Sequence, residues 1–265
     1  MKLLIAYDGT LHAKKALRYG MSKVQDRGGD ITVLQVFDPS LFIDYDAGPR
    51  AEEMARAEFS RFQAEARSIV SEQAGGFEVR FLSAEGDPLS AILGQSATLK
   101  PDLVLVTPQY KAVSRMSDRP VAVIPGTILA PVDSAGTPAA EIDLIEQEAK
   151  ATGSTVLVLG IVPVHLYSPA EREELGRVQE RITDAVLALQ KTLRARGIEA
   201  KTLQRAGYPD EEILRAAADE TVSLVLLPTG SATPSELAKA SAMLQDEPER
   251  LRWPVLFVPM GELPA

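Results

Sequence analysis

The sequence contains no cysteine and only two histidines. The absence of cysteine excludes disulfide bonds, thiolate catalysis and cysteine-ligated metal sites. The two histidines, His12 and His165, are far apart in the sequence and belong to no motif with the spacing of metal ligands. Each is therefore predicted to be a surface or loop residue rather than a metal ligand.

Dense clusters of positive charge are also missing. The chain has 37 acidic and 28 basic residues, which give a formal net charge of -9. Nucleic acids and anionic membranes are bound by clustered lysine and arginine, so we expect neither DNA, RNA nor a membrane surface as a partner. A single small nucleotide is compatible with this charge, because backbone amides can hold its phosphates.

Long apolar runs are the third feature that the sequence lacks. No stretch approaches about 18 apolar residues, the length that a membrane-spanning helix needs. The run in residues 1–8, MKLLIAYD, is too short for the core of a signal peptide and ends in an acid. Because the sequence shows neither a signal-peptide core nor a membrane-spanning run, we expect a cytoplasmic protein. The apolar fraction of 45% and the charged fraction of 25% are ordinary for globular proteins.

Four short segments of the first half recur in the same order in the second half. The pairs are LLIAYDGT (3–10) with ILAPVDS (128–134), GDPLSAI (86–92) with GYPDEEI (207–213), DLVLVTP (102–108) with SLVLLP (223–228), and PVAVIP (120–125) with PVLFVP (254–259). Their offset is nearly constant and grows only before the last pair, which indicates an insertion in the second half. The sequence therefore predicts a tandem duplication with domains 1–125 and 126–265.

Apolar runs of strand length alternate with helical segments in both halves. Strands are expected at about 2–7, 31–37, 77–82, 102–107, 121–124, 127–132, 155–162, 199–205, 222–227 and 255–258. Met54, Phe62, Ile69 and Val70 mark a helix in the first half. This alternation predicts an α/β fold of two tandem doubly wound domains, each with a five-stranded parallel sheet flanked by helices.

The equivalent helix of the second half has recognisable ends. Residues 168–171 (Ser-Pro-Ala-Glu) have the spacing of a capping box, with proline at the first helical position. Apolar residues then recur every three or four positions until Gly197 ends the helix. They are Leu175, Val178, Ile182, Val186, Leu189 and Leu193.

With these segments placed, the sequence resembles the universal stress protein family over essentially its whole length. Residues 128–134 and 4–10 are similar to the opening strand of that family, and residues 86–88 (Gly-Asp-Pro) to the turn that opens its third helix. Pro120-Val121 and Pro254-Val255 resemble the Pro-Val step at the start of its last strand. The resemblance implies that both domains are Rossmann-like units of the HUP type.

The resemblance also implies where a nucleotide would bind, with ATP as the candidate cofactor. In family members that hold ATP, the Asp after the first strand lies beside the nucleotide and the end of the second strand flanks the adenine. A loop of pattern G-x-x-G, nine residues, then G-[ST] holds the phosphates, because glycines let backbone amides approach them. The corresponding residues here are Asp8, Gly9, Val36, Asp133, Ser134, Val162, Thr229, Gly230 and Ser231.

Both halves depart from that phosphate loop. Residues 107–119 contain no glycine and are too few for a loop followed by a full helix. In the second half, Thr233 stands where the second glycine is expected, and residues 242–244 (Ala-Met-Leu) replace the Gly-Ser step. Asp8 and Asp133 therefore have an alternative role, which is to cap or orient the helix that follows each of them.

No nucleophile–base pair, metal cluster or pair of acids at catalytic spacing can be assigned, so we expect no enzyme. The first hypothesis is a stress-response or regulatory protein whose ATP-binding loop is degenerate in both halves. The alternative is a nucleotide-binding switch for ATP or AMP with an atypical phosphate loop, mainly in the second domain. Slow ATP hydrolysis ranks last, because it needs bound Mg²⁺ and phosphate contacts that glycine-poor loops are ill suited to provide.

The last strands of the two halves are the predicted association surface. An edge strand exposes amides and carbonyls that pair with another strand. In family dimers the last strands of two subunits pair antiparallel, so the resemblance implies an internal pseudo-dimer in which residues 121–124 pair with 255–258 through Val121, Ile124, Val255 and Val258. Equivalent strands of two chains would instead form a homodimer. The flanking prolines would limit either pairing to a few residues.

Overall fold

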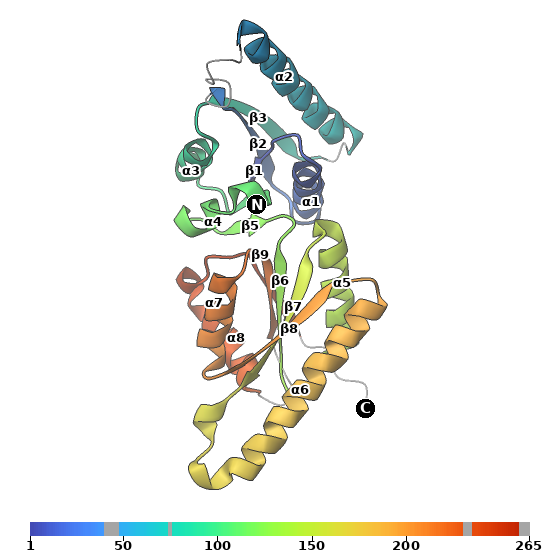
Figure 1. The fold of residues 1–265 in the computed structure, drawn as a ribbon, viewed down its shortest axis with the longest axis vertical. Helices are drawn as coiled ribbons and strands as arrows, with labels where there is room; N and C mark the ends of the chain where they lie inside the picture. The colour runs from blue at the N-terminus through green and yellow to red at the C-terminus, as the bar shows by residue number, and fades with distance from the viewer. Residues whose placement is uncertain (40–47, 74–75, 230–234, 260–265) are drawn as a thin grey trace. The chain divides into compact units, whose positions relative to one another are not determined.

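The computed structural model describes residues 1–39, 48–73, 76–229 and 235–259. The chain divides into two compact units, Met1–Pro125 and Gly126–Ala265. Each unit is a five-stranded parallel sheet with helices on both faces, as Figure 1 shows. The predicted fold class is confirmed.

The first unit has the strand order β3-β2-β1-β4-β5. Its strands are β1 (Lys2–Ala6), β2 (Asp30–Phe37), β3 (Glu78–Glu85), β4 (Leu103–Val106) and β5 (Val121–Val123). Its helices are α1 (Leu11–Arg27), α2 (Gly48–Glu72), α3 (Pro88–Leu99) and α4 (Val113–Met116), with a 3-10 turn η2 (Pro108–Tyr110). α1 and α2 cover one face of the sheet, and α3 and α4 cover the other (Figure 1).

The second unit repeats this arrangement with the strand order β10-β9-β6-β7-β8. Its strands are β6 (Thr127–Val132), β7 (Thr155–Val162), β8 (Ala200–Ala206), β9 (Val222–Thr229) and β10 (Val255–Pro259). Its helices are α5 (Ala139–Thr152), α6 (Arg172–Ala195), α7 (Pro209–Asp219) and α8 (Glu236–Asp246), with 3-10 turns η3 (Val164–Leu166), η4 (Pro169–Glu171) and η5 (Pro248–Arg250). α5 and α6 cover one face, and α7 and α8 the other (Figure 1).

The continuous apolar runs form these sheets because both faces of each sheet are buried. Successive side chains of a strand point to opposite faces. In β1, Leu3 and Ile5 therefore join the core under α1 and α2, whereas Leu4 and Ala6 join the core on the side of α3. All four side chains are at most 3% exposed.

The strand order reverses once in each sheet. In the first unit the reversal lies between β1 and β4, and in the second unit between β6 and β9. The loops that follow two neighbouring strands diverge to opposite faces there and leave a crevice at the carboxyl ends of the strands. In the first unit this crevice places the segment after β1 beside the segment after β4.

The long helix of the second unit begins one turn later than its sequence predicts. The capping box of Ser168 and Glu171 is present, and the Ser168 backbone amide donates to the Glu171 carboxylate at 2.9 Å. These residues close the 3-10 turn η4, and α6 starts directly after it at Arg172. The predicted stripe is confirmed, since Val178, Ile182, Val186, Leu189 and Leu193 are buried and the half-buried Leu175 packs against them.

The predicted first-half helix is α2, but Met54 does not belong to its inward face. Met54 is 73% exposed, although Ile69 is buried and Phe62 packs against the core. The inward face of α2 carries residues at three- and four-residue spacing that include Phe62, Ala66 and Ile69. Met54 precedes Phe62 by eight residues, which turns it about 80° around the helix from Phe62, and its side chain is exposed.

Candidate functional site

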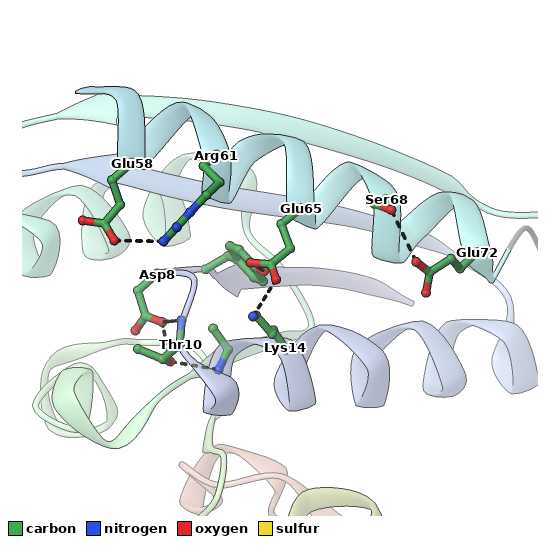
Figure 2. A network of polar contacts seen from close by, with 10 residues as sticks. Asp8, Thr10, Lys14, Glu58, Arg61, Glu65, Ser68 and Glu72 are labelled. Atoms are coloured by element: carbon green, nitrogen blue, oxygen red, sulfur yellow. Dashed lines mark hydrogen bonds and ion pairs between the residues drawn. The ribbon is translucent and has the colours of Figure 1, made fainter. Parts of the chain in front are cut away.

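The crevice of the first unit is organised by the carboxylate of Asp8. β1 ends at Ala6, and α1 begins at Leu11 with Thr10 as its N-cap, which accepts a hydrogen bond from the Ala13 amide. Asp8 Oδ1 accepts from the Thr10 amide at 2.9 Å and from the Thr10 hydroxyl at 2.5 Å (Figure 2). Asp8 therefore orients the capping residue of α1 rather than capping the helix directly.

The second oxygen of Asp8 joins β1 to the segment after β4. Asp8 Oδ2 accepts from the Thr107 hydroxyl at 3.0 Å and from the side-chain amide nitrogen Nε2 of Gln109. Thr107 is only 2% exposed, so this contact satisfies a buried donor. Both oxygens of Asp8 are thus engaged by the protein itself.

A cavity of about 300 Å³ opens beside this carboxylate. Of the predicted site residues in this unit, Asp8 and Val36 line it. Gly9 instead lies in a neighbouring hollow under Phe62, and a Cβ added to it would come within 2.4 Å of the Phe62 ring. With a φ of +76°, Gly9 is required by the turn and by this close approach.

Two tyrosines next to the cavity have raised pKa values. Burial and the nearby carboxylate of Glu65 raise the pKa of Tyr7, whose hydroxyl lies 3.5 Å from that carboxylate. Burial and the charge of Asp8 raise the pKa of Tyr110 to about 12. Both phenols are therefore uncharged at neutral pH and can donate hydrogen bonds, but neither is poised to act as a base.

The crevice of the second unit is built around Asp133, which follows β6. Asp133 Oδ1 accepts from the Ala135 amide at 2.8 Å. Asp133 and Ser134 line a cavity of about 200 Å³ with Arg181 at its wall. Val162 is buried at the end of β7, next to the lining residue Pro163.

Two predicted residues of this crevice lie outside the described residues. These are Gly230 and Ser231, which follow Thr229 at the end of β9. Thr229 itself is half-buried and pairs with Pro259 of β10 in the ladder. The structure therefore brings Asp133 and Ser134 to one cavity, and the sites of Val162, Thr229, Gly230 and Ser231 stay predictions.

A buried acid, Glu141, lies near Asp133, and no sequence pattern predicts its burial. Glu141 lies in the first turn of α5 and is 5% exposed. Burial, and secondly the charge of Asp133, raises the pKa of Glu141 to about 7. This carboxyl therefore changes its charge near neutral pH.

A histidine and a tyrosine stack beside the second cavity. The His165 ring lies 4.1 Å from the Tyr208 ring at an interplanar angle of 23°. His165 Nε2 is 3.9 Å from a carboxylate oxygen of Glu236, which lines the cavity. Both histidines are surface or loop residues as predicted, because His12 is exposed on the first turn of α1 and His165 lies in the short turn η3.

The part of the chain that the structure describes holds no group of three or more His, Asp or Glu side chains placed to bind a metal ion. None of its helices is long and apolar enough to cross a membrane.

The family model described as "Universal stress protein family" matches residues 1–118 and 126–241. The chain belongs to this family. The two matched segments correspond to the two units, so this universal stress protein carries the family domain twice. A search of curated protein sequences returns no match.

Solved structures of similar proteins include further universal stress proteins. One from Archaeoglobus fulgidus is 16% identical and covers 98% of this chain and 97% of its own, with a TM-score of 0.42. One from Burkholderia pseudomallei is 20% identical and covers 47% of this chain and 95% of its own, with a TM-score of 0.39. A universal stress protein in complex with cAMP is 14% identical and covers 47% of this chain and 95% of its own, with a TM-score of 0.38.

Proposed function

We propose that this universal stress protein is a stress-response or regulatory protein without enzymatic activity, and that its phosphate-binding loops are degenerate. The segment after β4 carries this proposal. It folds as η2 and the four-residue α4, separated by two residues. A phosphate would need backbone amides that point outward at this place.

The amides of this segment are largely used within it. The Tyr110 amide donates to the Thr107 carbonyl at 2.9 Å, the Ser114 amide to the Lys111 carbonyl at 3.1 Å and the Ser117 amide to the Val113 carbonyl at 2.8 Å. Gln109 and Thr107 also occupy the carboxylate of Asp8. The first unit therefore offers a nucleotide neither a glycine-rich loop for its phosphates nor an Asp8 that is free of protein partners.

Small molecules retained by the purified protein provide the test. The protein would be denatured, and the released compounds separated by ion exchange and identified by mass. We expect no stoichiometric nucleotide and no thermal shift with millimolar Mg-ATP. Nucleotide near one per chain would refute the degeneracy of the loops.

The second candidate function is a nucleotide-binding switch in the second unit. Arg181 favours it, because this cation lines the same cavity as Asp133 and Ser134 and can pair with a phosphate. Arg181 also lies 3.5 Å from Glu174, so a phosphate would compete with that carboxylate. ATP or AMP would be the ligand, and the predicted residues Val162, Thr229, Gly230 and Ser231 would complete the site.

Calorimetric titration of ATP, AMP and cAMP distinguishes the two candidates. If the switch is correct, the wild-type protein binds one of these nucleotides, Asp133→Ala abolishes the binding and Asp8→Ala does not. If the loops are degenerate, none of the three proteins shows binding heat. Equal affinity in wild type and Asp133→Ala would contradict the switch at this site.

Self-association through the last strands is the remaining part of the proposal. β5 and β10 are each the edge strand of their own sheet. Edge strands carry unpaired amides and carbonyls, and these are available to a second strand. Residues 121–124 would pair with 255–258 of the same chain, and the alternative is pairing between two chains in a homodimer.

A further inference from the structure

The cavity of the first unit is unusually aromatic for this protein. The whole chain has six tyrosines, seven phenylalanines and one tryptophan. Five of these side chains line the one cavity, namely Tyr7, Phe37, Phe59, Phe62 and Tyr110. Its volume of about 300 Å³ is at the lower end of the range for small-molecule sites. Walls of this kind favour a small flat ring system, which can stack on them or contact them edge-on.

α2 and the neighbouring strands position these rings. Ala55, Phe59 and Phe62 recur at three- and four-residue spacing and reach the cavity from α2. Phe37, at the end of β2, contacts Phe59 edge-on with ring centroids 5.6 Å apart. Three of the five rings are therefore held by α2 and β2 rather than by loops.

A buried amide donor lines the same cavity without a partner. Gln35 lies in β2 and is 2% exposed. Within the described part of the chain, its amide nitrogen has no hydrogen-bond partner. Leaving a buried donor unpaired costs about 1–3 kcal/mol, so a ligand that accepts a hydrogen bond here would recover part of that cost.

The charge of the lining disfavours an anionic ligand. Its described residues include the acids Asp8, Asp38 and Glu58 but no lysine or arginine. Nearby cations form ion pairs: Lys14 with Glu65 at 2.6 Å, Arg61 with Glu58 at 3.0 Å and Arg56 with Glu52 at 2.9 Å. Figure 2 shows the pair of Lys14 with Glu65, which joins α1 to α2, and the pair of Arg61 with Glu58, which lies on α2. A phosphate in the cavity would face these carboxylates, and the three cations named here are already paired with acids.

We infer that this cavity binds a small, uncharged, planar aromatic molecule that presents a hydrogen-bond acceptor to Gln35, and that it rejects phosphorylated ligands. The cavity includes Asp8 and Val36 of the predicted nucleotide site of the first unit, so this inference rests on the proposed loss of nucleotide binding there and goes beyond it by naming another class of ligand.

Three ring compounds of similar shape test the inference on the full-length protein. Quinoline carries a ring nitrogen that accepts a hydrogen bond and is uncharged at about pH 8. Naphthalene lacks the acceptor, and quinoline-3-carboxylate adds a negative charge. Dissociation constants would be measured by saturation-transfer NMR titration of each compound. We expect quinoline to bind about fivefold more tightly than naphthalene, because one net hydrogen bond changes a dissociation constant by about this factor.

Quinoline-3-carboxylate should bind at least about tenfold more weakly than quinoline, because its charge meets the acids of the lining. AMP at millimolar concentration should not displace quinoline. Absence of quinoline binding, equal affinity for the three compounds or displacement by AMP would each overturn the inference.

The variant Gln35→Met removes the donor while keeping the length of the side chain. It should abolish the preference for quinoline over naphthalene, so that both bind with equal affinity. The melting temperature of the unliganded variant should not fall, because the substitution removes an unpaired polar group from the interior. Gln63→Met is the matched control, since Gln63 of α2 donates to the Ser83 hydroxyl of β3 and lies outside the cavity lining. A preference that survives Gln35→Met would show that quinoline binds elsewhere and would overturn the inference.

Discussion

At the scale of single residues, Asp8 and Asp133 follow the first strand of their units but differ in their hydrogen bonds. Asp8 accepts from Thr10, Thr107 and Gln109, whereas the hydrogen bond found for the Asp133 side chain comes from the Ala135 amide. Within the described part of the chain, the repeated sequence has therefore produced one carboxylate that joins the segments after two strands and one that shapes a turn.

Alanine substitutions at these two positions should separate the two roles. Asp8→Ala leaves the buried Thr107 hydroxyl without its acceptor, so we expect a loss of about 2 kcal/mol in the free energy of unfolding. Asp133→Ala removes one turn hydrogen bond and should cost about 0.5–1 kcal/mol. Urea unfolding followed by far-UV circular dichroism measures both. Equal losses would show that the contact with Thr107 contributes no stability.

Glu141 predicts a dependence of stability on pH. Its pKa is raised by burial, and then by Asp133, to about 7, from 4.5 in the unfolded chain. A carboxyl with a raised pKa binds its proton more tightly in the folded state, so stability falls as pH rises from about 4.5 to 7. The loss is complete above pH 7 and amounts to at most about 3 kcal/mol.

Glu141→Gln removes this titration. The variant should be more stable than wild type by up to about 3 kcal/mol at pH 8 and equally stable near pH 4. Urea unfolding followed by the fluorescence of Trp253, the single tryptophan, reports on the second unit specifically. If Glu141→Gln differs from wild type in free energy of unfolding by the same amount at pH 4 and at pH 8, titration of the Glu141 carboxyl is not the cause of the difference.

At the scale of elements, the packing of α6 on β7 depends on a glycine. A Cβ added to Gly160 of β7 would lie 2.7 Å from a methyl carbon of Val186 and 2.9 Å from one of Ile182, both on α6. Gly176, on α6 itself, has no atom within 4 Å of an added Cβ. The same chemical change therefore has opposite consequences at the two positions.

We expect Gly160→Ala to lower the stability of the second unit by about 1–3 kcal/mol, because α6 must move away from the sheet. Gly176→Ala should raise it by about 0.5–1 kcal/mol, because alanine favours a helix interior. Trp253 fluorescence during urea unfolding measures both variants. A neutral effect of Gly160→Ala would mean that α6 has room to shift at no cost.

The sequence predicts these elements well, and the reason is physical. A strand buried on both faces is a nearly continuous apolar run, and all the observed strands lie within a few residues of their expected ranges. Helix faces are less certain when apolar residues are sparse. Met54 belongs to α2 but not to its inward stripe, and only the packing of that helix on the sheet reveals this.

The candidate sites are predicted only in part. Asp8 and Asp133 are found because the repeat and the family resemblance mark the ends of the first strands. Gln35 offers one usable signal, since an amide within the apolar run of β2 needs a partner. The positions of Tyr110 and Glu141 have no such signal, because their burial results from contacts between segments distant in sequence.

At the scale of the whole molecule, the duplication gives the chain two edge strands that carry the same sequence pattern. In both β5 and β10 a Pro-Val step precedes a short apolar strand, and each strand pairs with one neighbour in its own sheet. A protein that contains both halves of a dimer can satisfy these edges within one chain. The alternative is that each edge pairs with the equivalent strand of a second copy.

Light scattering coupled to gel filtration distinguishes these two arrangements. Internal pairing of 121–124 with 255–258 predicts the mass of one chain, 28.6 kDa, at all concentrations. Because the chain has no cysteine, an introduced pair such as Ala122→Cys with Phe257→Cys adds a direct test. In antiparallel register these two positions face each other, and mild oxidation should give a disulfide within one chain. Each single variant is the control and should stay monomeric under the same conditions. A two-chain mass for the wild type, with disulfides between chains in the double variant, would show instead that these edges join two molecules.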